Sequence, residues 1–195
     1  MRLDVKRSII FVAAIALLWT GSTFASVPVP APGAPDEDRL GTYLSVRAST
    51  LLAEIQTEAV GLTPHAETLK TYSWTPGRSW QSHAEYLQRV KDHINAVGER
   101  LAELQRIRDF ASPWQQQAIT EVTSHAAQVA ASTQAAIVHL RENQDRLFVP
   151  EYRDHLKTIA DRSRDMKQTV DKFLDYEETL LKLQRLQSEL EIART

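Results

Sequence analysis

The feature that most constrains the fold of this chain is an apolar stripe in the segment 80–104. Its members alternate steps of three and four residues: Trp80, His83, Leu87, Val90, Ile94, Val97, Leu101 and Leu104. Only His83 is polar. This heptad spacing places all eight side chains on one face of an α-helix and is typical of near-parallel helix packing. The pattern predicts a helix from Trp80 to Ala111 within a helical bundle.

A second helix is predicted to start directly after the first. Ser112 is a good N-cap, Pro113 a good first residue, and Gln115 the partner that completes a reciprocal capping box. The same spacing then continues through Ile119, Val122, Ala126, Val129, Thr133, Ala136, Leu140, Asn143 and Leu147. We therefore expect a helix that reaches Leu147, with Asn143 on its core-facing stripe.

A longer helix is predicted at the C-terminal end of the chain. Phe148 and Val149 precede Pro150, which suits the first position of a helix. Its stripe comprises Tyr152, Leu156, Ile159, Ser163, Met166, Val170, Phe173, Leu180, Leu183, Leu186 and Leu190. At 1.5 Å per residue this helix would be about 60 Å long, against about 45 Å for each of the two before it. We expect it to extend past them.

The N-terminal part of the bundle is predicted to contain one full helix and one short one. A helix begins near Asp36, carries Leu40, Leu44, Leu51, Ile55 and Leu62, and stops at Gly61. Thr63 and Pro64 then suit the N-cap and first residue of a short helix that ends near Tyr72. The Pro-Gly pair in 73–78 predicts a loop.

These elements predict an all-α fold. No segment shows the alternating apolar pattern of a β-strand. The short connections at 111–112 and 148–149 favour antiparallel neighbours. We therefore expect residues 36–195 to form an antiparallel up-down-up-down four-helix bundle with a long C-terminal helix.

The first 25 residues have the layout of a secretory signal peptide. Arg2, Lys6 and Arg7 precede an apolar run from Ile9 to Trp19, and small residues stand at the cleavage positions in Thr23-Phe24-Ala25. Eleven apolar residues are too few to span a bilayer. The sequence predicts cleavage after Ala25, export, and no membrane span in the mature chain. Residues 26–35, with four prolines, are predicted to form a semi-rigid linker.

The composition argues against several classes of function. Residues 1–25 hold three of the 23 basic and one of the 25 acidic residues, so the mature chain has 20 basic and 24 acidic residues. A mildly acidic chain has no general attraction for nucleic acid, and no nucleic-acid partner is expected. The absence of cysteine excludes thiolate metal sites, lipidated cysteine and c-type haem attachment. With no Asn-x-Ser/Thr site, the chain suggests the bacterial cell envelope.

Three polar side chains are expected to share one level of the bundle. Counting from the predicted turns places His83, Asn143 and His155 near the end that holds the 61–79 connection. These groups could form a metal or small-ligand site, since two imidazoles with a nearby carboxylate suit Zn²⁺ or Cu²⁺. The alternative is a structural layer whose members hydrogen-bond one another. The second interpretation is favoured, because the spacing matches no established ligand motif, and no cofactor is expected.

The sequence contains no catalytic motif. The Glu-x-x-His pairs of di-iron bundles do not occur, and there is neither a Gly-x-Ser-x-Gly elbow nor a glycine-rich phosphate loop. We therefore expect a protein that is not an enzyme.

Two surfaces are candidates for contacts with other proteins. The first is the leucine stripe of Leu180, Leu183, Leu186 and Leu190, which either packs on the first helix or serves docking and homo-oligomerisation. The second comprises Trp74 and Trp80, because tryptophan either caps the end of a bundle core or anchors an interface.

Two segments carry a resemblance to known sequences. The first segment comprises two nearby stretches, Trp80-Gln-Ser-His-Ala-Glu-Tyr-Leu87 and Val90-Lys-Asp-His-Ile-Asn95. The second segment is Ala111-Ser-Pro-Trp-Gln-Gln-Gln-Ala-Ile119. Over roughly residues 79–150 the chain resembles an uncharacterised family of exported bacterial all-helical proteins. The resemblance implies a helical fold and a location in the bacterial envelope, and no activity.

Together these observations predict an exported, non-enzymatic helical bundle that contacts an unknown protein partner in the cell envelope, as an adaptor or chaperone-like protein. The alternative is a bundle that binds a metal or small ligand through His83, Asn143 and His155.

Overall fold

In the part of the chain that the structure describes, the apolar spacing produces four long α-helices. A computed structural model describes residues 35–75 and 77–193, with α1 at Pro35–Tyr72, α2 at Trp80–Arg106, α3 at Pro113–Glu142 and α4 at Pro150–Ile192. A single 3₁₀ turn, η2, covers Arg108–Phe110 between α2 and α3. These residues contain no β-strand, which confirms the all-α fold class. The predicted signal peptide and most of the linker lie outside the described residues.

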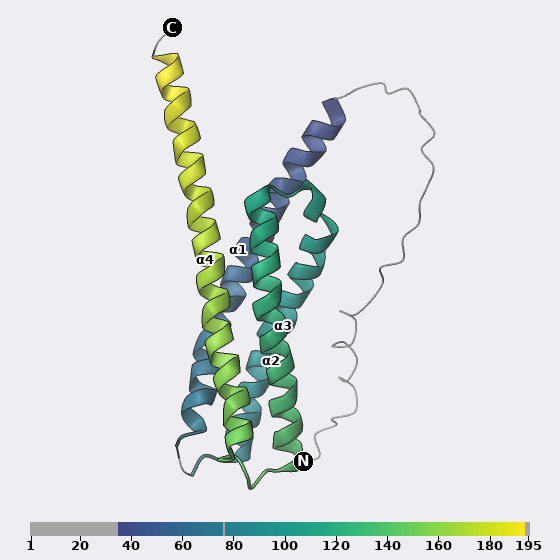
Figure 1. Cartoon of the computed structure of the whole chain (residues 1–195), viewed down its shortest axis with the longest axis vertical. Helices are drawn as coiled ribbons and strands as arrows, with labels where there is room; N and C mark the ends of the chain where they lie inside the picture. Colours follow the sequence, from purple (N-terminus) through teal and green to yellow (C-terminus); the bar gives the residue numbers. More distant parts are fainter. Residues whose placement is uncertain (1–34, 76, 194–195) are drawn as a thin grey trace, which may run out of the picture. The chain divides into compact units, whose positions relative to one another are not determined.

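The four helices pack as a ring in which α1 contacts α2 and α4, while α3 contacts α2 and α4. Figure 1 shows the α1–α2 and α3–α4 connections at the same end of the helices, and the α2–α3 connection at the other. We call the first the histidine end and the second the tail end, because α4 continues beyond it (Figure 1). The compact unit that contains these helices begins at Pro35.

The predicted stripes form the core. In α2 the buried residues are the predicted His83, Leu87, Val90, Ile94, Val97, Leu101 and Leu104. In α4 the predicted positions from Tyr152 to Phe173 are buried as well. Most of the α3 stripe is buried through Leu140. Because each stripe faces its neighbours, the heptad spacing alone identified the core face of α2, α3 and most of α4.

The prediction that Gly61 ends the first helix is wrong, because α1 runs without a break to Tyr72 with Pro64 inside it. Proline removes a helical hydrogen bond and costs about 3 kcal/mol. Leu62 and Leu69, one before and one after Pro64, are fully buried. Burying two leucines contributes about 3–6 kcal/mol, which offsets that cost. Packing against the rest of the bundle therefore keeps one helix where local signals predict two.

The start of α3 has the predicted capping box between Ser112 and Gln115. The backbone N–H of Ser112 donates to Oε1 of Gln115 at 2.8 Å. Gln115 is buried, and its amide nitrogen also donates to the Ser45 carbonyl and the Ser49 hydroxyl, both at 2.9 Å. This side chain therefore caps α3 and joins it to α1.

Two other helix ends differ from the prediction. Helix α2 stops at Arg106, and the 3₁₀ turn follows before Ala111. Helix α3 stops at Glu142, so Asn143 is a C-cap residue and does not lie on the helical stripe. The Asn143 backbone N–H and side-chain amide both donate to the His139 carbonyl, at 2.8 and 3.3 Å. A short amide side chain competes in this way with continued helix, and this ends α3 early.

Polar side chains connect α1 to α4 along much of their common length. From the histidine end toward the tail end, the pairs are Lys70–Asp161, Glu67–Arg164, Gln56–Asp171 and Ser49–Glu177. The pair nearest the tail end involves Glu177, and α4 continues for 15 more residues to Ile192. We call this last segment, residues 178–192, the tail.

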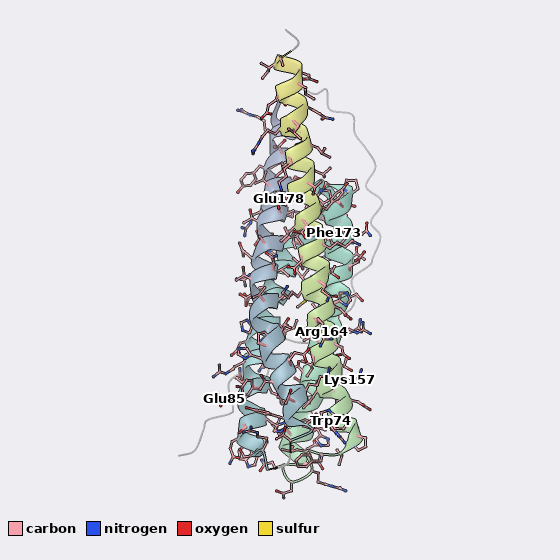
Figure 2. The ribbon with its side chains drawn as sticks, turned by 90° about the vertical axis from the view of Figure 1, so that its left-hand side faces the viewer. Trp74, Glu85, Lys157, Arg164, Phe173 and Glu178 are labelled. Carbon is pink, nitrogen blue, oxygen red and sulfur yellow. The ribbon has the colours of Figure 1, made fainter. Side chains whose placement is uncertain are left out.

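Figure 2 shows the tail of α4 projecting beyond the ends of α2 and α3. Figure 1 shows that the first turns of α1 lean away from it. No helix among the described residues is long and apolar enough to cross a membrane.

Candidate functional site

The histidine end contains a buried imidazole paired with a buried phenol. Nδ1 of His83, from the first turn of α2, lies 3.1 Å from the hydroxyl of Tyr152, from the first turn of α4, and both side chains are fully buried. The ring of Tyr72 lies 5.8 Å from the His83 ring. His139 stacks on Tyr152 with ring centroids 4.9 Å apart. All four helices thus contribute one ring to this cluster.

Burial determines the protonation states in this cluster. It lowers the pKa of His83 and raises the pKa of Tyr152. At neutral pH the pair therefore consists of a neutral imidazole and a neutral phenol. Nε2 of His83 is buried without a hydrogen-bond partner. One nitrogen of the His83 ring therefore has a hydrogen-bond partner and the other has none.

The structure does not bring the three predicted polar residues together in one layer. Asn143 and His155 line an open surface hollow of about 590 Å³, together with His139, Glu142 and Glu151. His83 is not among the residues that line it. The separation follows from the end of α3 at Glu142, which moves Asn143 out of the core. The prediction that Asn143 lies on the core-facing stripe of α3 is therefore wrong, since Asn143 is the C-cap residue and is only partly buried.

The hollow has few features of a metal centre. Among residues 35–75 and 77–193, no group of three or more His, Cys, Asp or Glu side chains is arranged to hold a metal ion. Nε2 of His139 is already 3.2 Å from the carbonyl of Arg146. The hollow is therefore an open feature of the surface whose lining includes His155, without an arranged set of metal ligands among the described residues.

A second histidine cluster lies between α1 and α2 and was missed in the sequence. Nδ1 of His93 is 2.8 Å from the carboxylate of Glu58, and the rings of His93 and His65 stack with centroids 5.7 Å apart. Arg100 approaches the other oxygen of Glu58 at 3.7 Å. Burial, followed by the charge of Arg89 and by His93, lowers the pKa of His65.

Gly61 makes room for this second cluster. A Cβ atom at residue 61 would lie 2.6 Å from Cε1 of His93, which is closer than real Cβ contacts. Glycine destabilises the interior of a helix, so a glycine inside a helix indicates that another group packs closely against the backbone there. Gly61 was therefore the sequence signal for this close approach. The sequence predicts a helix stop at Gly61 because it does not show that the His93 ring packs over this residue.

The tail carries the largest run of exposed apolar side chains. Leu183, Leu186 and Leu190 are between 52 % and 65 % exposed, and Leu181 is 57 % exposed. Leu180 is half-buried. The alternative in which the predicted stripe packs on the first helix is therefore wrong for Leu183, Leu186 and Leu190.

The exposed leucines do not continue the core face of α4. That face has buried residues up to Val170 and Phe173, and its register continues through Glu177, Leu180, Gln184 and Gln187. Leu183, Leu186 and Leu190 each lie one residue before a position of that register, at 184, 187 and 191. One residue turns the helix by about 100°. The leucines of the tail therefore face about a quarter of a turn away from the core of the bundle.

The rotated stripe begins at Tyr176. The ring of Tyr176 packs edge-on against Trp114 at the start of α3, with centroids 6.1 Å apart. Alternating steps of three and four then give Thr179, Leu183, Leu186 and Leu190. We call these five residues the tail stripe. It starts against α3 and continues past the bundle, where the described residues provide no cover for its leucines.

The two tryptophans of the predicted second surface lie at the histidine end. Trp74 is 67 % exposed, and the guanidinium of Arg153 lies 3.3 Å from the centre of its ring. Figure 2 shows Trp74 at the opposite end of the bundle from the tail. Trp80 is 38 % exposed. Both rings are accessible, and their role in binding stays a prediction.

No family model matches this sequence, and no curated protein or solved structure matches it significantly. The function must therefore be inferred from the residues of this chain.

Proposed function

We propose that this protein is an exported, non-enzymatic helical bundle that acts as an adaptor or chaperone-like protein in the bacterial cell envelope. In this proposal the chain is cleaved after Ala25, and the mature protein is tethered through no covalent lipid. The helices form an antiparallel up-down-up-down bundle whose two ends serve as contact surfaces. Two ring contacts at the histidine end support this topology, since Tyr72 of α1 meets His83 of α2 and His139 of α3 meets Tyr152 of α4.

The exposed tail stripe is the observation that carries the proposal. An apolar face on a helix that projects past its bundle is costly in water unless another surface covers it. Amphipathic helices bind partners by laying such a face into an apolar groove or against another helix. The leucines of the tail stripe lie at 3-4 spacing, as that mode of binding requires.

The helix that presents the stripe is built to hold its position. Phe173 and Val170, immediately before the tail, are buried in the core, and Glu177 is bound to Ser49 of α1. The tail therefore continues a helix that the bundle has already formed. Because nucleation is the unfavourable step in forming a helix, a partner need not order this segment from coil.

The non-enzymatic assignment is supported by the ring cluster at the histidine end. The neutral His83 and Tyr152 are fully buried, and neither lines the hollow that a ligand could enter. An acid–base group must reach its substrate within hydrogen-bonding distance. A buried pair that contacts only other side chains suits a structural role.

Site-specific photo-crosslinking in the native host tests the proposal. A photoreactive residue at Leu186 is expected to give a discrete protein adduct, because this position is on the tail stripe. The same residue at Ser188 provides the matched control, since Ser188 is also exposed and lies on the other side of the helix. Equal labelling at both positions, or no adduct at Leu186, would contradict the proposal.

A chaperone-like role makes a further prediction in solution. The protein should slow the aggregation of an unfolded model protein, and Leu183→Glu with Leu186→Glu should abolish the effect. The control pair Gln184→Glu with Ser188→Glu adds the same charge off the stripe. If both pairs behave alike, or if the unmodified protein has no effect, the chaperone-like form of the proposal fails and the adaptor form stands on the crosslinking result.

A further inference from the structure

We infer that the tail stripe pairs with the tail stripe of a second copy of this chain, in antiparallel orientation, as a short two-stranded coiled coil. This inference rests on the proposed use of the tail as a contact surface and names its partner. It follows from the charges beside the stripe.

The tail stripe supplies the apolar layers of such a pair. Written as a heptad, Tyr176, Leu183 and Leu190 occupy position a, and Thr179 and Leu186 occupy position d. In an antiparallel pair, position a of one helix faces position d of the other. Leu183 of each copy then meets Leu186 of the other copy, so the pair contains two equivalent Leu183–Leu186 layers. Leu190 of each copy lies across from Thr179 of the other.

The charges that flank the stripe are complementary in the antiparallel orientation. Lys182 and Glu189 are the residues at position g, directly before Leu183 and Leu190. Antiparallel pairing brings the two g positions together, so Lys182 of each copy faces Glu189 of the other. Two equivalent opposite-charge pairs result. In a parallel pair, position g faces position e, where Lys182 would meet the uncharged Gln187.

Both charged groups are available for this contact. Glu189 makes no ion pair with the described residues of its own chain. Lys182 makes one with Glu178 at 2.5 Å, and both of these side chains are about two-thirds exposed. Exposed ion pairs of this kind contribute little, so Lys182 can exchange or share its partner at small cost.

The bundle leaves space for a second helix along this face. The leucines of the tail stripe are turned about a quarter of a turn from the core, and α2 and α3 end below them (Figure 1). No described side chain of the same copy buries Leu183, Leu186 or Leu190. A second tail would cover this row of leucines and complete the contact that Tyr176 begins on Trp114.

Charge exchange distinguishes antiparallel pairing from every other arrangement. In sedimentation equilibrium of the protein purified after export, the unmodified chain is expected to approach the mass of a dimer as its concentration rises. Lys182→Glu and Glu189→Lys should each shift the equilibrium toward monomer, because each places two like-charged pairs across the contact. An equimolar mixture of the two variants should restore the dimer, since every facing pair is then of opposite charge.

Matched variants control for the change in net charge itself. Arg185→Glu and Glu191→Lys make the same charge changes at exposed positions away from the contact, and the dimer should persist in both. If the two pairs of variants have the same effect, the inferred register is wrong. If Lys182→Glu and Glu189→Lys leave a dimer intact, the antiparallel orientation is wrong.

Disulfide formation provides a second measurement, because the chain has no cysteine of its own. A mixture of Leu183→Cys and Leu186→Cys should form the mixed disulfide under mild oxidation, more than either variant forms a disulfide alone. Preferential self-linking of each single variant would indicate parallel pairing and overturn the inference. At a concentration low enough for every variant to be monomeric, circular dichroism should show the same melting temperature for all of them, since the substituted side chains are exposed in the monomer.

The outcome separates this inference from the proposed function. A protein that stays monomeric at every concentration overturns self-pairing, even if photo-crosslinking at Leu186 still yields an adduct with a different protein. An adduct of twice the mass of the chain at Leu186 supports both. A monomer without any adduct at Leu186 overturns both.

Discussion

The hydroxyl of Tyr152 lies 3.1 Å from Nδ1 of His83, and the two side chains are fully buried where α4 and α2 begin. This contact joins two residues that are 69 apart in the chain, on the two helices that lie across the ring from each other. It is the only hydrogen bond that the described structure gives to the His83 ring, since Nε2 has no partner.

Replacing Tyr152 by Phe is expected to destabilise the protein by about 1–3 kcal/mol, because both nitrogens of the buried His83 ring would then lack a partner. Urea unfolding followed by circular dichroism measures this. Tyr43→Phe is the control, since Tyr43 is exposed and its change should lie within about 0.5 kcal/mol of zero. Equal stability of the two variants would show that the hydrogen bond contributes nothing.

The stability of the fold should decrease as the pH falls below about 6.5, the ordinary pKa of histidine in an unfolded chain. Burial lowers the pKa of His83 in the folded protein, so the unfolded chain takes up a proton first. The stabilisation is therefore complete at neutral pH and is lost as the pH falls toward the lower, folded-state pKa. The free energy of unfolding, measured in urea at several pH values, should show this slope.

His83→Leu should make the acid slope shallower, because it removes the buried imidazole whose pKa is lowered. Some slope should remain in His83→Leu, because the pKa of His65 is also lowered, by burial and by the charge of Arg89. An identical slope in His83→Leu and the unmodified protein would be inconsistent with this account.

Two glycines inside helices should respond differently to alanine. At Gly98 an added Cβ meets nothing within 4 Å. Gly98→Ala should therefore stabilise α2 by about 0.5–1 kcal/mol. At Gly61 the Cβ would displace His93 from Glu58. Gly61→Ala should be less favourable than Gly98→Ala by about 1 kcal/mol, the net contribution of one hydrogen bond.

A double variant tests the cause of that difference. With His93→Ala in place, Gly61→Ala should become as favourable as Gly98→Ala, since no ring opposes the new methyl group. Thermal melts of the unmodified protein, Gly61→Ala, Gly98→Ala, His93→Ala and the double variant give the comparison. A persistent penalty at Gly61 in the His93→Ala background would point to a backbone cause.

Divalent metals should leave the melting temperature unchanged at neutral pH. A bound metal stabilises the folded state by RT ln(1 + [L]/Kd), so Zn²⁺ or Cu²⁺ would raise the melting temperature if His83, Asn143 and His155 formed a site. His83 is buried away from the hollow that the other two line. A rise that is lost in His155→Gln would instead support the metal-binding alternative.

Cleavage after Ala25 follows from the charged start, the apolar run and the small residues before Ser26. The intact mass of the exported protein should correspond to residues 26–195. A mature species that retains residues 1–25 would indicate an uncleaved anchor and would contradict the proposed release into the envelope.

The sequence was sufficient to predict those features of the fold that depend on a single helix. The spacing from His83 to Leu104 identified the buried face of α2 residue by residue, and Pro113 and Pro150 marked the starts of α3 and α4. These features are local, because a heptad stripe, an N-cap and a proline at the first position each act within a few residues of the chain.

The candidate site was predicted less well. Counting from the turns placed His83 at the correct end, but it missed its contact with Tyr152 and placed Asn143 in the core. The His93–Glu58 pair was also missed. Such contacts depend on how two helices are rotated against each other, and the spacing within one helix does not contain that rotation.

The sequence by itself determined that residues 35–192 form long helices with apolar stripes, because the stripe of each helix is a property of its own period. Only the tertiary structure decided whether each stripe is covered. It kept α1 continuous through Pro64, since leucines on both sides of the proline are buried by other helices. It left Leu183, Leu186 and Leu190 exposed, since α2 and α3 end before the tail and α1 leans away from it (Figure 1). Burial is a relation between helices, and the period of one helix cannot specify it.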